Sequence, residues 1–262
     1  MAHSLRLEHR GYAQIDVRYL DQVLTFDPHL RPSAKSTVVL TWNWADKVLS
    51  TARATREGML LSVHAAPLLQ SWVVYHQNWS QPEEQGVRIL RSSYTPLSKW
   101  PITEHIRRGM SPVFRPYEVA RRLWYRLKVP RTPPDIVLIE FPSGASLLHL
   151  NLSVYDGAPE SNWKKVLELM QRRSDPNKPI SWVLTGCDYD RKGRHGRVLL
   201  DRLKELPAEH IIFCDLLGDF RREVSLPTGI LTPLVDQAIT EGLSAHILAP
   251  HASYRFETIE LI

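Results

Sequence analysis

Alternating apolar and polar positions predict a series of short strands at the start of the chain. Runs rich in β-branched and aromatic residues are separated there by polar turns, which is typical of strands with one buried face. The predicted strands are 5–7, 13–18, 22–26 and 37–40. Apolar residues three or four apart then predict a helix over 45–57, which Gly58 would cap. A short strand over 60–66 and a helix opened by Pro67 follow.

The second half of the chain alternates strand and helix patterns. Two apolar runs, 135–141 and 146–154, flank a Pro-Ser-Gly turn and predict a β-hairpin. The helices predicted after it are 160–173, 196–206 and 233–243, and the strands are 179–190 with its loop, 209–216, 245–251 and 255–261. Two halves that each mix strands with helices fit a two-layer core with approximate internal symmetry.

Between the halves lies a Pro- and Arg-rich insertion, 80–134, which is predicted to be mostly loop with one basic helix. A connection of this length is unusual unless it covers a site or a partner surface. Val119, Leu123 and Leu127 form an apolar stripe at helical spacing. The candidate anion-binding side chains largely off that stripe are Arg121, Arg122, Arg126 and Lys128. The alternative is a solvated helix face.

Composition and charge narrow the class of protein. The chain has 262 residues, 43% of them hydrophobic, which suffices for a full core. It has no apolar run long enough for a membrane span and no signal-peptide pattern, so we expect a cytoplasmic protein. Its two cysteines, Cys187 and Cys214, form no CxxC pair. The net charge of +5 permits an anionic partner, nucleic acid included.

One stretch has the shape of a catalytic loop. In Val38–Ser50, "VVLTWNWADKVLS", an apolar strand runs into Thr41 and a helix begins near Ala45. Together with "VLTFDPHLRP", Val23–Pro32, it resembles the start of a metallo-β-lactamase-fold protein, in the branch related to L-ascorbate-6-phosphate lactonase. That resemblance implies one α/β domain over 1–262, built as a four-layer αββα sandwich.

The family's metal-binding motif, Thr-His-x-His-x-Asp-His, corresponds here to the seven residues that begin at Thr41. Asp46 matches the family aspartate, whereas Trp42, Trp44 and Lys47 stand at the three histidine positions. The resemblance therefore implies a degenerate motif. If the resemblance does not hold, the two tryptophans are ordinary packing aromatics.

Two later landmarks of the family are similar in placement. The predicted hairpin ends near Asn151, where the family has Gly-Asp, and the dipeptide would be Leu150-Asn151 or Asn151-Leu152. The sequence "ILAPHASYRF" resembles the strand before the last family ligand, which would be His251. The resemblance thus implies a vestigial active-site pocket formed by Trp42, Trp44, Asp46, Lys47, Asn151 and His251.

The chemistry of these residues argues against a metal. A hydrolytic zinc site needs about three His, Asp or Cys donors. Tryptophan offers no lone pair to a metal, and the ammonium of Lys47 opposes a dication. We therefore expect no metal cofactor; zinc or manganese belongs to the alternative of an active hydrolase.

A rival motif follows a later strand. Asp188, Asp190 and Gly193 form Asp-x-Asp-x-x-Gly, which resembles the metal-binding half of a Toprim domain. Glu140 would be the third carboxylate of that alternative metal site, which would hold magnesium for phosphodiester chemistry. A polar turn explains the same residues.

The leading hypothesis is a non-catalytic metallo-β-lactamase-like protein. It would bind a protein partner or an anionic ligand, as a regulatory or binding component, through the former active-site face. The first alternative is a metal-dependent hydrolase of a phosphodiester or another phosphorylated substrate. The second is a basic nucleic-acid-binding module. No membrane association is expected.

Overall fold

The computed structural model describes residues 3–11, 14–27, 37–39, 59–61, 87–93, 135–150, 160–186, 194–216, 229 and 231–258. Its strands are β1 (His3–Gly11), β2 (Gln14–Tyr19), β3 (Gln22–Phe26), β4 (Thr37–Val39), β5 (Met59–Leu61), β6 (Arg88–Ser93), β7 (Asp135–Glu140), β8 (Ser146–His149), β9 (Ile180–Thr185), β10 (Ala208–Cys214), β11 (Ala245–Leu248) and β12 (Ser253–Thr258). Its helices are α5 (Glu160–Gln171), α6 (Arg194–Leu203) and α8 (Thr232–Thr240).

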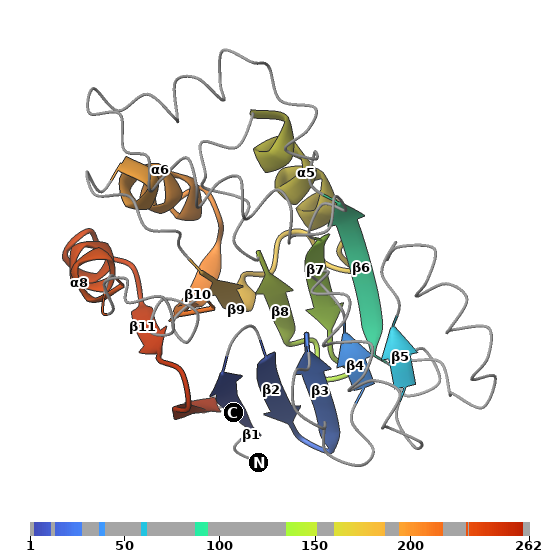
Figure 1. Ribbon diagram of the computed structural model, residues 1–262. Coiled ribbons are helices and arrows are strands. Elements are labelled where there is room, and N and C mark those ends of the chain that lie inside the picture. The colour runs from blue at the N-terminus through green and yellow to red at the C-terminus, as the bar shows by residue number, and fades with distance from the viewer. Residues whose placement is uncertain are drawn as a thin grey trace, which may run out of the picture.

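The strands form two six-stranded sheets (Figure 1). The N-terminal sheet has the order β12-β1-β2-β3-β4-β5, and the C-terminal sheet has the order β11-β10-β9-β8-β7-β6. In the N-terminal sheet β3, β4 and β5 run parallel, while β1, β2 and β3 form an antiparallel meander and β12 pairs antiparallel with β1 at its edge. In the C-terminal sheet β8 to β11 run parallel, and β6 and β7 complete one edge with antiparallel pairs.

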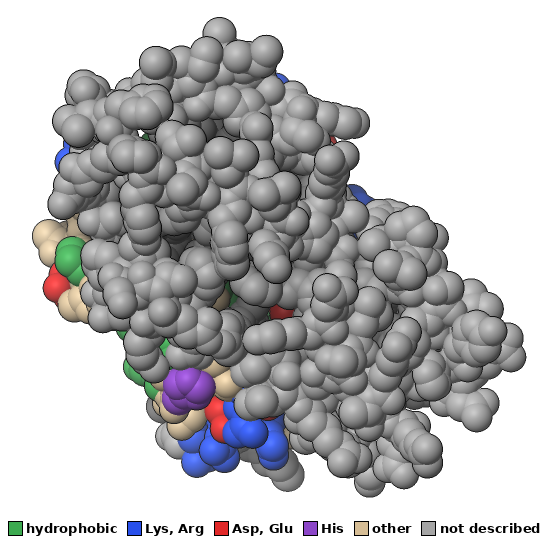
Figure 2. All heavy atoms as spheres, viewed as in Figure 1, with side chains coloured by type: hydrophobic (Ala, Val, Ile, Leu, Met, Phe, Trp, Pro, Cys, Tyr) green, Lys and Arg blue, Asp and Glu red, His purple; other side chains and the backbone are tan. Residues whose placement is uncertain are grey.

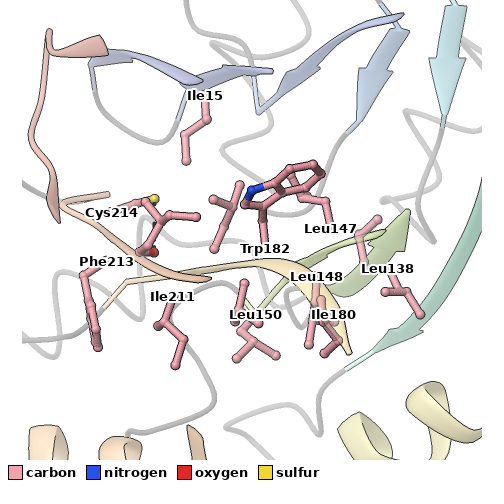
Figure 3. Close-up of a cluster of buried hydrophobic side chains, with 14 of the residues drawn as sticks. Ile15, Leu138, Leu147, Leu148, Leu150, Ile180, Trp182, Ile211, Phe213 and Cys214 are labelled. Atoms are coloured by element: carbon pink, nitrogen blue, oxygen red, sulfur yellow. Dashed lines mark hydrogen bonds between the residues drawn. The ribbon is translucent and has the colours of Figure 1, made fainter. Parts of the chain in front are cut away.

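The two sheets pack face to face through apolar side chains. Ile15 of the N-terminal sheet points toward Trp182, Leu147 and Cys214 of the C-terminal sheet (Figure 3). The ring of Tyr19 lies 5.3 Å from that of Trp182, in an edge-on arrangement. Aromatic side chains of this size bury much apolar surface and fix the spacing between two layers. This interface is the main core of the molecule.

Helices cover the other face of the C-terminal sheet (Figure 1). Leu138, Leu148 and Phe213 point away from the N-terminal sheet, toward the helical side (Figure 3). All six residues of β9 are buried, which explains its continuous apolar sequence. Strands buried on both faces need an apolar side chain at almost every position. None of the described helices has the length and apolarity required to cross a membrane.

The predicted architecture of two mixed sheets packed face to face is confirmed. The predicted hairpin is also confirmed, because β7 and β8 pair antiparallel around a turn in which Gly144 has a φ of 80°. One prediction was wrong: part of the insertion 80–134 is strand β6, not loop. Arg88 and Arg91 interrupt the apolar pattern of this edge strand: Arg88 is exposed and pairs with Glu140, whereas Arg91 is partly buried. The helices predicted over 45–57 and from Pro67 lie outside the described residues.

Candidate functional site

The carboxyl ends of many strands meet at one edge of the sandwich, here called the strand-end edge. The parallel strands β8, β9, β10 and β11 all end there, in the C-terminal sheet. The end of β3 in the N-terminal sheet joins them, because the ring of Phe26 stacks on that of His149 with 4.8 Å between centroids. Ligand sites of α/β sheets favour the carboxyl ends of strands. The strand-end edge is therefore the candidate site.

His9 ties the two sheets together at this edge. Its side chain is fully buried at the end of β1, and its Nδ1 accepts a hydrogen bond from the backbone N–H of Gly11 at 3.1 Å. Nε2 must then carry the proton, and it lies 3.2 Å from the carbonyl oxygen of Asp215, just after β10. With both ring nitrogens engaged in these bonds, His9 has a structural role.

His149 is the buried titratable group at the edge. Burial lowers the pKa of its imidazole to about 4, so the ring is neutral at physiological pH. Among the residues that the structure describes, its buried Nδ1 has no hydrogen-bond partner. A buried polar atom without a partner is uncommon in folded proteins and calls for an explanation. Its place at the end of β8, next to the expected Leu150-Asn151 dipeptide, makes it a candidate to face a ligand.

Backbone conformation also singles out this edge. Only three described non-glycine residues have positive φ: Leu20 at 54°, Asp27 at 42° and His251 at 63°. Leu20 lies in the turn between β2 and β3, but Asp27 follows β3 and His251 follows β11 at the strand-end edge. Residues in the left-handed region cost about 1–2 kcal/mol and concentrate at functional sites. Strain at two points of one edge favours a functional role.

Three further described groups of the edge are buried. Thr185 and Cys214 are buried at the ends of β9 and β10. Burial raises the pKa of the Cys214 thiol, so it is protonated and unreactive, as its apolar sequence setting predicts. Asp27 is buried as well, and its backbone N–H donates to the carbonyl oxygen of Val39 at 3.0 Å.

The described residues do not fit a metal ion. Among them, no three His, Cys, Asp or Glu side chains come together in a group that could hold one. The two buried histidines of the edge already make other interactions. His9 forms hydrogen bonds with backbone atoms, and the ring of His149 stacks on that of Phe26. Leu150, at the expected Gly-Asp position, is a buried apolar residue.

Two of the site residues predicted from the sequence can be placed. His251 is exposed at the strand-end edge, three residues after the end of β11. Glu140 ends β7, which runs antiparallel to β8, so it lies at the opposite edge from the end of β9 at Thr185. Its carboxylate accepts hydrogen bonds from Arg88 at 2.9 Å and from the Ser174 hydroxyl at 3.0 Å. These bonds give Glu140 a structural role of its own.

The other predicted site residues lie outside the described residues. They are Trp42, Trp44, Asp46, Lys47, Arg121, Arg122, Arg126, Lys128, Asn151, Asp188 and Asp190. The predicted three-carboxylate metal site and the basic surface therefore stay predictions.

Sequence reasoning missed His9 and His149 as residues of the edge. No motif surrounds His9, and its position follows only from the pairing of β1 with β12 and β2. His149 had a usable signal, because it directly precedes the dipeptide expected at the old metal site. A single histidine in an apolar strand is more often packing, which hid that signal.

Comparisons with known proteins agree with this arrangement. No family model and no curated protein matches the sequence. Among solved structures, Igni18, a metallo hydrolase from Ignicoccus hospitalis, is similar with a TM-score of 0.59 at 13% identity, over 98% of this chain and all of Igni18 (100%). CmlA, a diiron β-hydroxylase from Streptomyces venezuelae, is similar with a TM-score of 0.54 at 13% identity, over 97% of this chain but only 54% of CmlA.

A third structure is YhfI from Bacillus subtilis, described as a metallo-β-lactamase fold protein. Its TM-score is 0.50 at 10% identity, and the match covers 96% of this chain and 99% of YhfI. One of these proteins is a hydrolase and another a hydroxylase, so the shared feature is the architecture and not the reaction. The chain has the metallo-β-lactamase fold.

Proposed function

We propose that this protein is a non-catalytic member of the metallo-β-lactamase fold that binds an anionic ligand or a protein partner at the strand-end edge. The observation that carries the proposal is the character of the edge itself. It combines backbone strain at Asp27 and His251 with a buried imidazole nitrogen on His149 that has no hydrogen-bond partner in the described part of the chain. Features of this kind cost stability, and a binding function explains why they are present.

The residue types of the degenerate motif support binding without metal catalysis. Trp42 and Trp44 supply flat apolar surface and indole N–H donors but no metal ligand. Lys47 supplies a positive charge beside Asp46. Aromatic surface next to a cation is suited to holding an anionic or polar ligand, whereas it cannot activate a zinc-bound water.

Metal content is the direct test. The protein is purified without an affinity metal and without chelator, and zinc, iron and manganese are measured by mass spectrometry. We expect far less than one ion per chain and no change in melting temperature when EDTA is added. One tightly held ion per chain contradicts the proposal.

A restored motif tests the placement of the site. The variant with Trp42→His, Trp44→His and Lys47→His returns three imidazoles to the family positions. We expect it to bind zinc measurably, and we expect addition of Asp46→Asn or His251→Ala to weaken that binding. The matched control carries three histidines at exposed positions on three different helices, Lys164, Asp201 and Asp236, because histidines three or four apart on one helix would form a zinc site of their own. Equal zinc binding by control and restored variants contradicts the placement.

Ligand binding is tested separately. Small phosphorylated and carboxylated compounds are screened for an increase in melting temperature. We expect at least one to stabilise the wild type clearly more than the His251→Ala and Lys47→Ala variants. A panel in which every stabilising compound acts equally on all three proteins argues against binding at the strand-end edge.

The alternative is a metal-dependent hydrolase of a phosphorylated substrate. Two observations favour it: Igni18 is a metallo hydrolase, and the net charge of +5 suits an anionic substrate. This alternative predicts that the protein hydrolyses a generic phosphodiester, such as bis(p-nitrophenyl) phosphate, when zinc or manganese is added. Hydrolysis that requires the added metal and is lost in the His251→Ala variant supports the alternative.

A further inference from the structure

Two histidines and two aromatic residues meet at one side of the sandwich. The chain passes there from β11, an edge strand of the C-terminal sheet, to β12, an edge strand of the N-terminal sheet (Figures 1 and 2). His210 of β10 and His246 of β11 lie with 5.4 Å between their ring centroids. The ring of Phe256 in β12 lies 5.0 Å from that of His210 and 4.9 Å from that of His246. Tyr254 of β12 lies 5.3 Å from His246, and we call these four residues the histidine cluster.

The histidine cluster belongs to the layer between the two sheets. His210 is the strand partner of Trp182, whose ring contacts Tyr19 of the N-terminal sheet. His246 is the partner of Ile212, which lies two residues after His210 and therefore on the same face of β10. Ile212 is fully buried, whereas both histidines are only partly buried, so protons from solvent can reach their rings. Titratable groups thus stand where the C-terminal sheet meets β12.

Hydroxyl groups connect the two rings. The Ser244 hydroxyl lies 3.0 Å from Nδ1 of His210 and 3.4 Å from Nε2 of His246. Nδ1 of His246 lies 3.1 Å from the Tyr254 hydroxyl. Each hydroxyl can donate and accept, so these hydrogen bonds are all formed when each ring has one protonated and one free nitrogen. When both rings are fully protonated, Ser244 faces two donors and its own hydrogen has no acceptor in this group.

The surroundings favour neutral rings. Burial lowers the pKa of both histidines, and the nearby His210 lowers the pKa of His246 further. Glu209, the neighbour of His210 in β10, raises the pKa of His210 but does not offset burial. The strands β9 and β11 carry no further ionisable side chain, and β1 places Leu5 and Leu7 opposite the two aromatic residues of β12. Protonation of the cluster therefore has a cost.

The other charged groups near this side are directed elsewhere. Arg255 lies between Tyr254 and Phe256 and is therefore on the opposite face of β12. Glu241, which precedes β11, forms an ion pair with Lys204. Charge in the histidine cluster thus comes from the two histidines themselves.

We propose that the histidine cluster is a pH-sensitive lock, which holds β12 in the sandwich while both rings are neutral and releases it when they are protonated. As an edge strand, β12 forms its ladder with β1 alone. The rings of the cluster attach it in addition to β10 and β11. Two positive rings this close repel each other in a partly buried site, whereas release of β12 lets water surround both. In acid β12 therefore frays from β1 while β9 and β10 stay paired.

The direction of the effect follows from linkage. Both rings have a lower pKa in the closed sandwich than the 6.5 of a free histidine, so release becomes more favourable as the pH falls below 6.5. Each unit by which a pKa is lowered raises the opening equilibrium about tenfold, once the ring is protonated only in the open form. His210 lies near the start of β10, away from the strand-end edge, so the inference does not rest on the proposed function.

Amide hydrogen exchange, corrected for the intrinsic effect of pH, measures the release strand by strand between about pH 7.5 and 5. We expect the protection of β12 and of its partners in β1 to fall about tenfold or more, and to stay well below that of β9. In the variant His210→Gln, His246→Gln neither side chain takes up a proton, so the protection of β12 should stay nearly constant. Glu209→Gln keeps both rings and removes the charge that raises the pKa of His210, so release should need a lower pH.

The matched control is His149→Phe, which removes another histidine whose pKa is lowered by burial and leaves the cluster unchanged. It should keep the wild-type response of β12, and the protection of β9 at neutral pH confirms that each variant is folded. Constant protection of β12 in the wild type overturns the proposal. Equal protection of β12 and β9 in acid also overturns it, because the release is then global unfolding. So does an unchanged loss in the double glutamine variant, or release of Glu209→Gln at the wild-type pH or above it.

Discussion

The outer faces of the two sheets differ. The C-terminal sheet carries helices on its outer face, and every residue of β8 and β9 is buried. In β2 of the N-terminal sheet, exposed Arg18 precedes buried Tyr19. One sheet is packed on both faces, whereas the outer face of the other carries charged side chains such as Arg18. Substitutions in the C-terminal sheet should therefore cost more stability than substitutions of exposed charged side chains on the N-terminal sheet.

The largest expected effect comes from the core between the sheets. Trp182→Ala leaves a cavity against Tyr19 and Ile15, and we expect it to lower the free energy of unfolding by about 3–5 kcal/mol. Urea denaturation measures the change. The control is Ile239→Ala on α8, which is 54% exposed and should change stability by less than about 0.5 kcal/mol. Similar losses in both variants would mean that the interface between the sheets is not the main core.

The pH dependence comes next in size. His149 has a pKa of about 4 in the folded protein against 6.5 for the free side chain, so the unfolded state binds the proton more readily. The stability that this neutral histidine contributes is complete above pH 6.5 and is lost as the pH falls toward 4, by roughly 3 kcal/mol. Denaturation at a series of pH values measures this loss.

A variant isolates this effect from other histidines. Burial also lowers the pKa of His210 and His246, so they add a loss in the same direction. His149→Phe should remove the steepest part of the profile and leave the remainder. Identical profiles for variant and wild type between pH 6.5 and 4 would show that His149 is accessible to water.

The charged face of the N-terminal sheet should tolerate change better, except at the buried carboxylate of Asp16. Asp16 accepts hydrogen bonds from Thr25 at 2.9 Å and from Gln14 at 3.3 Å. We expect Asp16→Ala to cost about 1–3 kcal/mol, because these buried donors lose their acceptor. Asp201→Ala on α6, where the side chain is 65% exposed, is the control and should cost less than about 1 kcal/mol. Equal small losses would place Asp16 in solvent.

The smallest effect concerns three arginines in neighbouring cross-strand positions, Arg255, Arg6 and Arg18, and it has the opposite sign. Arg6 faces two arginines and Arg18 faces one, so Arg6→Thr should stabilise the fold by roughly 0.2–1 kcal/mol and Arg18→Thr by less. The gain should shrink at high salt, because these charges are exposed. Thermal denaturation at two salt concentrations measures it. Destabilisation by Arg6→Thr would mean that the guanidinium has a stabilising contact.

The sequence by itself determined most of the local structure. Alternating patterns located β1, β2 and β3, and continuous apolar runs located β9 and β10. Such patterns are informative because the spacing of apolar residues along a strand reflects which of its faces are buried. The short Pro-Ser-Gly turn fixed the β7–β8 hairpin. The motif around Thr41 indicated the metallo-β-lactamase fold, which is confirmed. The sequence did not predict strand β6, because its arginines interrupt the apolar pattern and made the segment resemble a loop.

Only the tertiary structure decided which distant segments meet. The last strand, β12, pairs with the first strand, β1, although it follows β11 of the other sheet. The alternation of apolar and polar residues shows which face of a strand is buried, but it does not show which strand lies beside it. That pairing places Arg255 opposite Arg6 and places His9 at the strand-end edge, beside the end of β10. Neither feature has a local signal, since each depends on residues brought together from opposite ends of the chain.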